Sequence, residues 1–263
     1  MGAVFKIGIV IPCYNEAERL PVREFIKYAK RNDDVHFIFV NDGSTDDTQS
    51  LVDGLVSANQ KSFSVVTLDK NRGKAAAVRA GFSFAFKKGI PLIGYWDADL
   101  AAPLNAIKEL CALVKNDVCL VMGARVKLLG RDIRRRSFRH YTGRFFAMAV
   151  SLILDLPVYD TQCGAKVFKN TPDIRRIFSR PFTVRWIFDV EILTRMRLIE
   201  RATKGPSIEE SVVEYPLMAW RDVKGSKVTL PGFLTAIFDL LTIYRILHLP
   251  ALSPYRIDDL TSF

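Results

Sequence analysis

The chain has 263 residues, of which 49% are hydrophobic and 25% charged, a balance that excludes a disordered protein. Lysine and arginine outnumber aspartate and glutamate by 38 to 28, and the net charge of +10 favours an anionic partner: nucleic acid, acidic lipid or a phosphorylated substrate. A chain of this length buries a core without covalent crosslinks. Its four cysteines show no CxxC pairing, so we expect reduced, mostly buried thiols in a cytosolic compartment.

No targeting or membrane-spanning segment is expected. A predicted strand begins at residue 6, which leaves no room for a signal peptide. The longest apolar stretches cover residues 145–154 and 233–249. The first is about half as long as a bilayer span, and the second carries Asp239 and Arg245. The sequence therefore predicts no transmembrane helix.

The first half of the chain alternates apolar runs with helical patterns. We predict strands at residues 6–12, 35–42, 63–69, 92–99 and 118–124. We predict helices at residues 20–30, 45–58, 73–88 and 103–115. This alternation predicts an α/β fold, with a mainly parallel, Rossmann-like sheet and helices on both faces.

The pattern changes after about residue 125, where a basic run at 131–144 leads into an apolar helix that ends at Leu154. We predict a strand at 211–218, a loop at 220–227 and a largely apolar helix at 233–247. No repeat or low-complexity linker divides the chain, so we expect one domain. Its predicted parts are residues 1–125, residues 126–232 and a C-terminal amphipathic helical segment (233–263).

Polar residues follow four of the predicted strands. They form the groups Tyr14-Asn15-Glu16, Asp42-Gly43-Ser44, Asn71-Arg72-Gly73-Lys74 and Asp97-Ala98-Asp99. Ligands of such sheets bind beyond the carboxyl ends of the strands, so these groups predict one composite site. Asp97 and Asp99 can hold a hard divalent cation at a diphosphate, because such cations prefer carboxylate oxygens. An isolated DxD is more often a helix cap, but a position beside three other polar strand ends reverses that preference.

The groups that contain glycine allow structural and functional interpretations. Gly43 suits a tight turn and Ser44 or Thr45 can cap the next helix. Neither role explains Asp42, which suits hydrogen bonding to a base or ribose. Gly73 opens a helix whose N-terminus favours an anion. This segment lacks the full spacing of a P-loop, which excludes an ATPase.

The segments IVIPCYNE, FVNDGSTD, NRGKAAAVRAG and DADLAAP, in this order and spacing, resemble family 2 glycosyltransferases with the GT-A fold. In the second half, YDTQCGAKVF, VRWIFDVEIL and the GSK of VKGSK are similar to dolichyl-phosphate β-glucosyltransferases and their prokaryotic polyprenyl-phosphate relatives. The resemblance covers roughly residues 7–227. It implies a nucleotide-sugar donor, a polyprenyl-phosphate acceptor and a Mg2+ or Mn2+ cofactor. It also makes residues 1–125 the nucleotide-binding half and residues 126–232 the acceptor and sugar half.

The resemblance also implies a role for each matching position. Asp97 and Asp99 would hold the metal at the donor diphosphate. The other predicted donor-binding residues are Pro12, Tyr14, Glu16, Asp42, Lys74, Arg221 and Lys227. The predicted catalytic residues are Asp99, Asp189, Glu191, Gln162 and Trp186, the last four around the sugar. The predicted contacts of the acceptor phosphate are Arg125, Arg136, Ser137 and Arg139.

Two positions bear on the identity of the sugar. At the position of Ala101, mannosyl relatives often have a polar metal ligand, whereas glucosyl-type relatives have a small residue, so Ala101 favours the glucosyl type. Arg221, in contrast, resembles the mannosyl branch. The second-half motifs favour UDP-glucose. The sugar, the nucleotide, the lipid length, a third metal ligand and the oligomeric state stay open. Eukaryotic glucosyl members carry an N-terminal membrane anchor and many bacterial relatives C-terminal spans, and we expect neither here.

Several features of the second half allow alternatives. The basic run at 131–144 is a solvated face, a nucleic-acid patch or an interfacial helix with arginines among phosphate headgroups. The last explains both its charge and its apolar continuation, so we expect an anionic membrane surface and no nucleic acid. Trp186 suits the core as well as a sugar platform. Asp189 and Glu191 are two residues apart, so a strand would place them on the same side and a helix would not. Cys163 has no nearby histidine, so we expect packing and not nucleophilic attack.

The expected chemistry is a single inverting displacement, in which a lipid-phosphate oxygen attacks the anomeric carbon and the nucleoside diphosphate leaves. An ionised phosphate needs no general base, whereas a hydroxyl acceptor does, and Asp189 is then the candidate. Transfer to a saccharide hydroxyl is the alternative enzyme. A catalytically silent membrane-binding GT-A module is the alternative from another class. We expect a peripheral protein on the cytoplasmic, inner face of the membrane.

Overall fold

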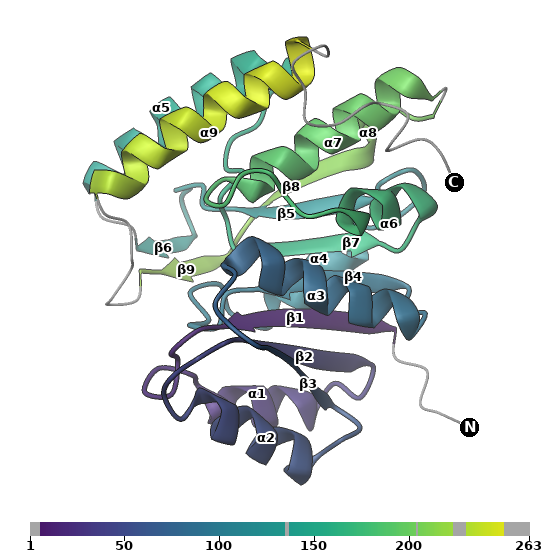
Figure 1. Cartoon of the computed structure of the whole chain (residues 1–263), viewed down its shortest axis with the longest axis vertical. Coiled ribbons are helices and arrows are strands. Elements are labelled where there is room, and N and C mark those ends of the chain that lie inside the picture. Colours follow the sequence, from purple (N-terminus) through teal and green to yellow (C-terminus); the bar gives the residue numbers. More distant parts are fainter. Residues whose placement is uncertain (1–5, 135–136, 204, 223–229, 250–263) are drawn as a thin grey trace.

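The computed structural model describes residues 6–134, 137–203, 205–222 and 230–249. Its centre is a seven-stranded sheet in the order β3-β2-β1-β4-β7-β5-β8 (Figure 1). The strands are β1 (Ile7–Cys13), β2 (Val35–Asp42), β3 (Phe63–Leu68), β4 (Leu92–Trp96), β5 (Leu120–Ala124), β7 (Ala165–Lys169) and β8 (Val212–Pro216). Neighbouring strands run parallel except at β7, which is antiparallel to both β4 and β5. The predicted α/β fold with a mainly parallel sheet is confirmed.

Helices cover both faces of this sheet (Figure 1). They are α1 (Val22–Ala29), α2 (Thr48–Ala58), α3 (Lys74–Lys87), α4 (Ala106–Ala112), α5 (Ser137–Leu154), α6 (Pro172–Ser179), α7 (Phe188–Ala202), α8 (Ile208–Ser211) and α9 (Leu230–His248). Successive side chains of β2 alternate between two cores. Phe37 and Phe39 pack with α1, α2 and α4, whereas Ile38 and Val40 pack with α3, α6 and α7. Both faces are buried, which explains the nearly continuous apolar runs of the strands.

The elements predicted in the first half are all present, several of them shorter by a few residues. In the second half, the loop predicted at 220–227 is wrong at its start. Trp220 and Arg221 lie in β9 (Ala219–Arg221), which pairs in parallel with β6 (Asp132–Arg134). Trp220 is 9% exposed and its strand partner Ile133 is 7% exposed, so burial of this apolar pair favours the strand.

Helices α5 and α9 lie side by side at one end of the molecule and pack on α7 (Figure 1). Both helices expose large apolar side chains, including Phe145 and Leu152 on α5 and Phe238 on α9, which are 74%, 77% and 68% exposed. No helix in the described part of the chain is long and apolar enough to span a bilayer.

Candidate active site

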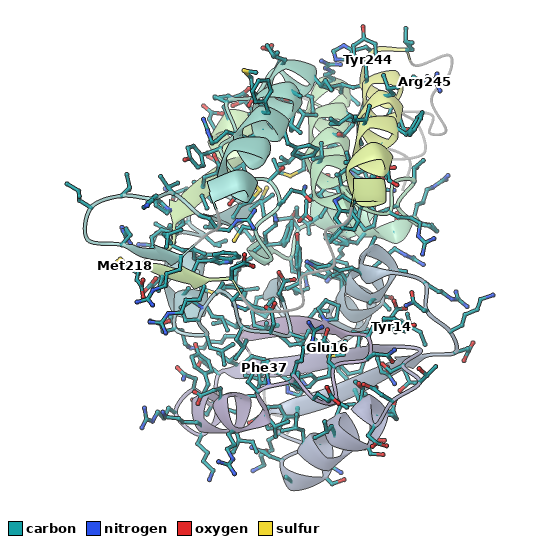
Figure 2. The ribbon with its side chains drawn as sticks, turned by 90° about the vertical axis from the view of Figure 1, so that its left-hand side faces the viewer. Tyr14, Glu16, Phe37, Met218, Tyr244 and Arg245 are labelled. Carbon is teal, nitrogen blue, oxygen red and sulfur yellow. The ribbon has the colours of Figure 1, made fainter. Side chains whose placement is uncertain are left out.

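A pocket of about 300 Å³ lies beyond the carboxyl ends of the first strands. Four segments line it: the loop after β1, the end of β2, the start of α3 and the end of β4. The predicted site residues in its lining are Pro12, Tyr14, Glu16, Asp42, Lys74, Asp97 and Asp99. In Figure 2, Tyr14 and Glu16 lie beside the strands of the first half, far from Tyr244 and Arg245 on α9. The structure therefore brings this group together, while the role of each member stays a prediction.

Asp42 holds the loop that leads into α3. Its two carboxylate oxygens accept the backbone N–H groups of Arg72 and Gly73, each at 2.8 Å. Asp42 is 3% exposed, and these bonds offset the cost of burying its carboxylate. Gly43 follows with a φ of 63°, and a side chain at this position would come within 2.4 Å of the Lys70 backbone. Asp42 therefore shapes a wall of the pocket.

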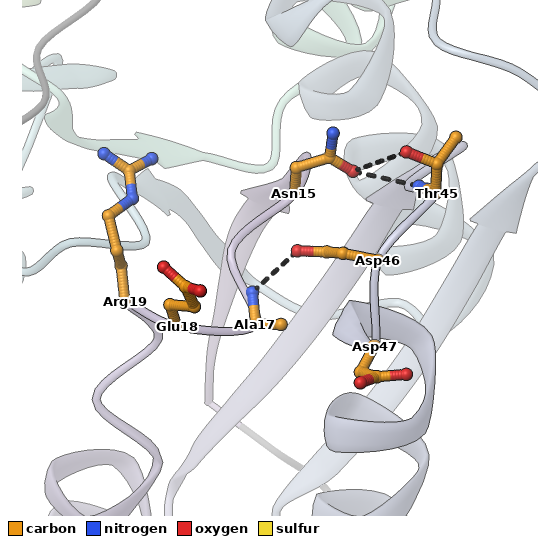
Figure 3. Close-up of a pocket in the computed structure, with 7 residues that line it drawn as sticks. All are labelled: Asn15, Ala17, Glu18, Arg19, Thr45, Asp46 and Asp47. Carbon is orange, nitrogen blue, oxygen red and sulfur yellow. Dashed lines mark hydrogen bonds between the residues drawn. The ribbon is translucent and has the colours of Figure 1, made fainter.

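The loop after β1 and the turn after β2 interlock (Figure 3). Asn15 Oδ1 accepts the N–H of Thr45 at 2.9 Å, and an Asp46 carboxylate oxygen accepts the N–H of Ala17 at 3.1 Å. The same residues line a second pocket of about 440 Å³. These bonds fix the backbone next to Tyr14, so the wall of the first pocket is held by polar contacts between two strand ends.

Lys74, Asp97 and Asp99 bring three charges to one side of the pocket. Lys74 Nζ lies 2.5 Å from Asp97 Oδ1. Burial alone would lower the pKa of Lys74, but the carboxylates of Asp97 and Asp189 outweigh this effect and raise it. Burial and the neighbouring charge of Asp97 raise the pKa of Asp99. A cation beside Asp99 would relieve this repulsion, so the two carboxylates suit a divalent metal ion.

The turn before β7 lies directly against Asp97. The Asp97 N–H donates to the Gly164 carbonyl at 2.9 Å, and a Cβ added to Gly164 would lie 1.8 Å from Asp97 Oδ2. Only glycine allows this approach. Gln162 in the same turn is half-buried and donates to Thr161 Oγ1 at 3.4 Å, and its contact with a sugar stays a prediction. Burial raises the pKa of Cys163 to about 12, which matches a packed thiol and not an activated one.

Asp189 and Glu191 lie on α7 and neither lines the pocket. Asp189 is 4% exposed, its Oδ1 lies 2.6 Å from Lys166 Nζ, and it accepts the Tyr95 hydroxyl. Its predicted place around the sugar, and its predicted role as the base for a hydroxyl acceptor, stay predictions. Glu191 is 0% exposed, pairs with Arg195 at 2.7 Å and accepts two backbone N–H groups of the preceding loop. These partners hold the Glu191 carboxylate inside the core, and its predicted place around the sugar stays a prediction.

The predicted acceptor-phosphate residues are described only in part. Arg125 donates two side-chain N–H groups to Asp160, at 2.6 and 2.7 Å, and its guanidinium lies 5.3 Å from the Trp220 ring. This bidentate pair is strong and holds the side chain beside Asp160, and the contact of Arg125 with an acceptor phosphate stays a prediction. The side chains of Ser137 and Arg139, and the whole of Arg136 and Lys227, lie outside the described residues.

Arg221 lies beside the loop that carries the two aspartates. Its backbone N–H donates to the Ala101 carbonyl at 3.0 Å, and its guanidinium donates to Asp132 at 2.9 Å. This position agrees with a donor contact, which stays a prediction. Trp186 is 39% exposed and is not part of the pocket lining. Its backbone N–H donates to Asp239 on α9 at 3.2 Å, so Trp186 joins the loop before α7 to α9.

Four residues at or behind the pocket were given no role by the sequence prediction: Tyr95, Gly164, Lys166 and Arg185. The Arg185 guanidinium comes within 3.6 Å of the place where a Gly73 side chain would begin, at the first turn of α3. A lysine inside the apolar run AKVF was the available signal for Lys166, since a buried lysine requires partners. Tyr95 and Gly164 gave no such signal, because a tyrosine and a glycine are ordinary in strands and turns.

Residues 8–173 match glycosyl transferase family 2. The chain belongs to that family. Its relatives include dolichyl-phosphate beta-glucosyltransferases: the Drosophila melanogaster protein is 32% identical over 241 residues, and the Homo sapiens protein is 31% identical over 239 residues. Each comparison covers 85% of this chain and 69% of the relative. The resemblance on which the predicted roles rest is thereby confirmed.

Solved glycosyltransferases share this fold. Glucosyl-3-phosphoglycerate synthase from Mycobacterium tuberculosis, in complex with Mn2+ and UDP-glucose, has a TM-score of 0.62 at 16% identity, over 92% of this chain and 78% of that one. Mannosyltransferase PcManGT from Pyrobaculum calidifontis, in complex with GDP-Man and Mn2+, has a TM-score of 0.56 at 17% identity, over 91% of this chain and 62% of that one. The present chain spans less than two thirds of the latter. Both likenesses confirm the GT-A fold.

Proposed function

We propose that this family 2 glycosyltransferase transfers glucose from UDP-glucose to a polyprenyl or dolichyl phosphate, with inversion, at a membrane surface. The observation that carries the proposal is the pocket in which Tyr14 and Asp42 meet Asp97 and Asp99. Relatives named dolichyl-phosphate beta-glucosyltransferase support the sugar and the acceptor. The second-half motifs favour UDP-glucose as the donor.

Asp97 and Asp99 would hold the divalent cation, Mg2+ or Mn2+. In the described part of the chain, no third His, Cys, Asp or Glu joins them in a metal-binding group. When bound, the metal stabilises the charge that develops on the leaving diphosphate. Lys74, which lies 2.5 Å from Asp97, adds a second positive charge on the same side of the pocket.

The buried position of Asp189 favours a phosphate acceptor over a hydroxyl. Attack by a hydroxyl requires a general base within hydrogen-bond reach of the acceptor. Asp189 was the candidate for that role, and its carboxylate is buried and paired with Lys166. A phosphate oxygen is already ionised near neutral pH, so the protein needs only to align it with the anomeric carbon and exclude water. Attack opposite the leaving diphosphate inverts the anomeric centre.

The test is transfer from labelled UDP-glucose, UDP-GlcNAc and GDP-mannose to a short polyprenyl phosphate, with and without Mn2+ or Mg2+. We expect metal-dependent product from UDP-glucose and its loss in Asp99→Ala. If product forms only with a saccharide acceptor, the acceptor is a sugar hydroxyl and not a lipid phosphate. A protein that makes no product and shows no metal-dependent thermal shift with UDP or GDP is a silent module, and the proposal then fails.

The membrane surface is proposed to bind helices α5 and α9. Their exposed apolar side chains recur at helical spacing, with Phe145 and Leu152 on α5 and Phe238 and Leu241 on α9. Apolar helix faces of this kind insert at the boundary of headgroups and acyl chains, and the net charge of +10 favours anionic lipid. We expect the nucleotide-sugar donor to be cytosolic, and we therefore propose the cytoplasmic face of the membrane.

Flotation with anionic liposomes at low salt tests this surface. We expect wild-type protein to float and the double variant Leu152→Glu/Phe238→Glu to stay at the bottom of the gradient. Leu113→Glu is the matched control, because Leu113 is a 36% exposed leucine after α4, away from both helices. Equal flotation of the double variant and the control would exclude α5 and α9 as the membrane contact.

A further inference from the structure

Lys166 on β7 is a buried lysine with a full set of partners. Its side chain is 1% exposed. Its ammonium donates to the carbonyls of Thr161 and Cys163, at 2.9 and 2.6 Å, and lies 2.6 Å from Asp189 Oδ1. An ammonium has three donors, and these three acceptors match them. Burying such a charge costs several kcal/mol per ion, and apolar residues of similar volume often give equal or greater stability, so stability alone does not explain Lys166.

The partners of Lys166 lead to the predicted metal ligand. Thr161 and Cys163 belong to the turn that ends at Gly164, and the Gly164 carbonyl accepts the Asp97 N–H at 2.9 Å. The Gly164 backbone also lies against the Asp97 carboxylate. A shift of this turn would therefore move the surface on which Asp97 rests.

A second connection runs through Tyr95 on β4, two residues before Asp97. The Tyr95 hydroxyl donates to Asp189, and its ring centroid lies 5.3 Å from Lys166 Nζ and 5.8 Å from Lys74 Nζ. Cations near an aromatic ring are attracted by its quadrupole. Charges of alternating sign thus link Lys166 and Asp189 in the core to Lys74 and Asp97 at the pocket.

We propose that Lys166 is a positioning residue: anchored by Asp189 and Tyr95, it holds the turn ending at Gly164 and thereby fixes Asp97 for the metal-bound donor. Lys166 acts through Asp97 and touches no substrate. The inference rests on the proposed metal-assisted donor binding, and it does not depend on the identity of the acceptor. It also gives Asp189 a role that differs from that of a general base.

The test measures Mn2+ binding in the presence of UDP by electron paramagnetic resonance, and UDP binding without metal by calorimetry. In Lys166→Met we expect Mn2+ affinity to fall about 10- to 100-fold, the usual effect of losing a group that orients a metal ligand. Binding of UDP without metal should stay unchanged. Lys169→Met is the matched control, because Lys169 lies on the same strand and donates to the Asn116 carbonyl at 3.0 Å. It should leave both affinities unchanged.

A second variant covers the case in which an unpaired Asp189 destabilises the core. Lys166→Met/Asp189→Asn removes both charges and keeps an acceptor for the Tyr95 hydroxyl. We expect it to restore the melting temperature of the metal-free protein towards the wild-type value but not the Mn2+ affinity. If the double variant recovers both the melting temperature and the Mn2+ affinity, Lys166 has only a structural role. The same conclusion follows if Lys166→Met loses metal-dependent and metal-free UDP binding equally. Wild-type protein that binds Mn2+ and UDP without transferring sugar would refute the proposed function and leave this inference standing.

Discussion

Gly164→Ala places one methyl group against the predicted metal ligand. The new Cβ would lie 1.8 Å from Asp97 Oδ2, 2.2 Å from Cγ and 2.5 Å from Oδ1. Ordinary contact between such atoms begins at roughly 3.4 Å. The distance from the new Cβ to Asp97 Oδ2, 1.8 Å, is shorter than this by more than 1 Å, so the carboxylate or the turn must move by that amount. Lys166 holds the turn at two carbonyls, and we therefore expect most of the movement to fall on the Asp97 side chain.

The expected cost has two parts. Overpacking of this kind lowers the free energy of unfolding by about 1–3 kcal/mol. Misplacement of a positioned group by about 1 Å lowers turnover by about 10²-fold. We expect Gly164→Ala to remain folded, with metal-dependent sugar transfer reduced by about that factor and the Mn2+-induced rise in melting temperature diminished.

Gly54→Ala is the matched control for this variant. Gly54 lies inside α2, and a Cβ there would meet no atom within 4 Å. Alanine at this position should stabilise the protein by about 0.5–1 kcal/mol and leave transfer unchanged. The assays are thermal unfolding with and without Mn2+ and UDP, and initial rates of transfer. Wild-type rates and unchanged Mn2+ stabilisation in Gly164→Ala would refute the contact between this turn and Asp97.

Three further predictions concern ionisable groups. Burial and Asp97 raise the pKa of Asp99, so the stability that protonated Asp99 contributes to the metal-free protein is fully present below the unfolded pKa of aspartate and is lost as the pH rises through the folded value. Asp99→Asn should therefore raise the metal-free melting temperature at pH ~7 and abolish Mn2+ stabilisation; a lower melting temperature would contradict the sign. Glu191→Gln removes the carboxylate that neutralises the buried guanidinium of Arg195, and should cost about 3–5 kcal/mol in urea unfolding without a specific rise in the KM for the donor. Near-normal stability with a raised KM would instead favour a contact of Glu191 with the sugar. Burial raises the pKa of Cys163 to about 12, so N-ethylmaleimide at pH ~8 should not inactivate the native enzyme. Rapid inactivation that UDP prevents would contradict this and indicate a reactive thiol at the pocket.

The predicted residues that line the pocket share one feature: each lies at the carboxyl end of a parallel strand, or in the loop or first helical turn that follows it. Parallel strands end at one edge of the sheet, so Tyr14, Asp42 and Asp97 meet there once the strands are recognised. Periodicity predicted the strands, and the polar residues that end them needed no knowledge of long-range packing. The second half offered no such rule, because β7 enters the sheet antiparallel between β4 and β5.

The sequence by itself determined the alternation of strands and helices, the carboxyl-end pocket and the aspartate pair, because apolar periodicity and the polar residues at strand ends are local properties. Only the tertiary structure decided that Glu191 belongs to the core, since its partner Arg195 lies one helical turn away on a helix that the short motif did not reveal. The same holds for Asp189, whose charge is neutralised by Lys166 on a different element. Whether a carboxylate faces a substrate or a buried cation depends on the packing of elements distant in the chain, and a motif of ten residues does not contain that information.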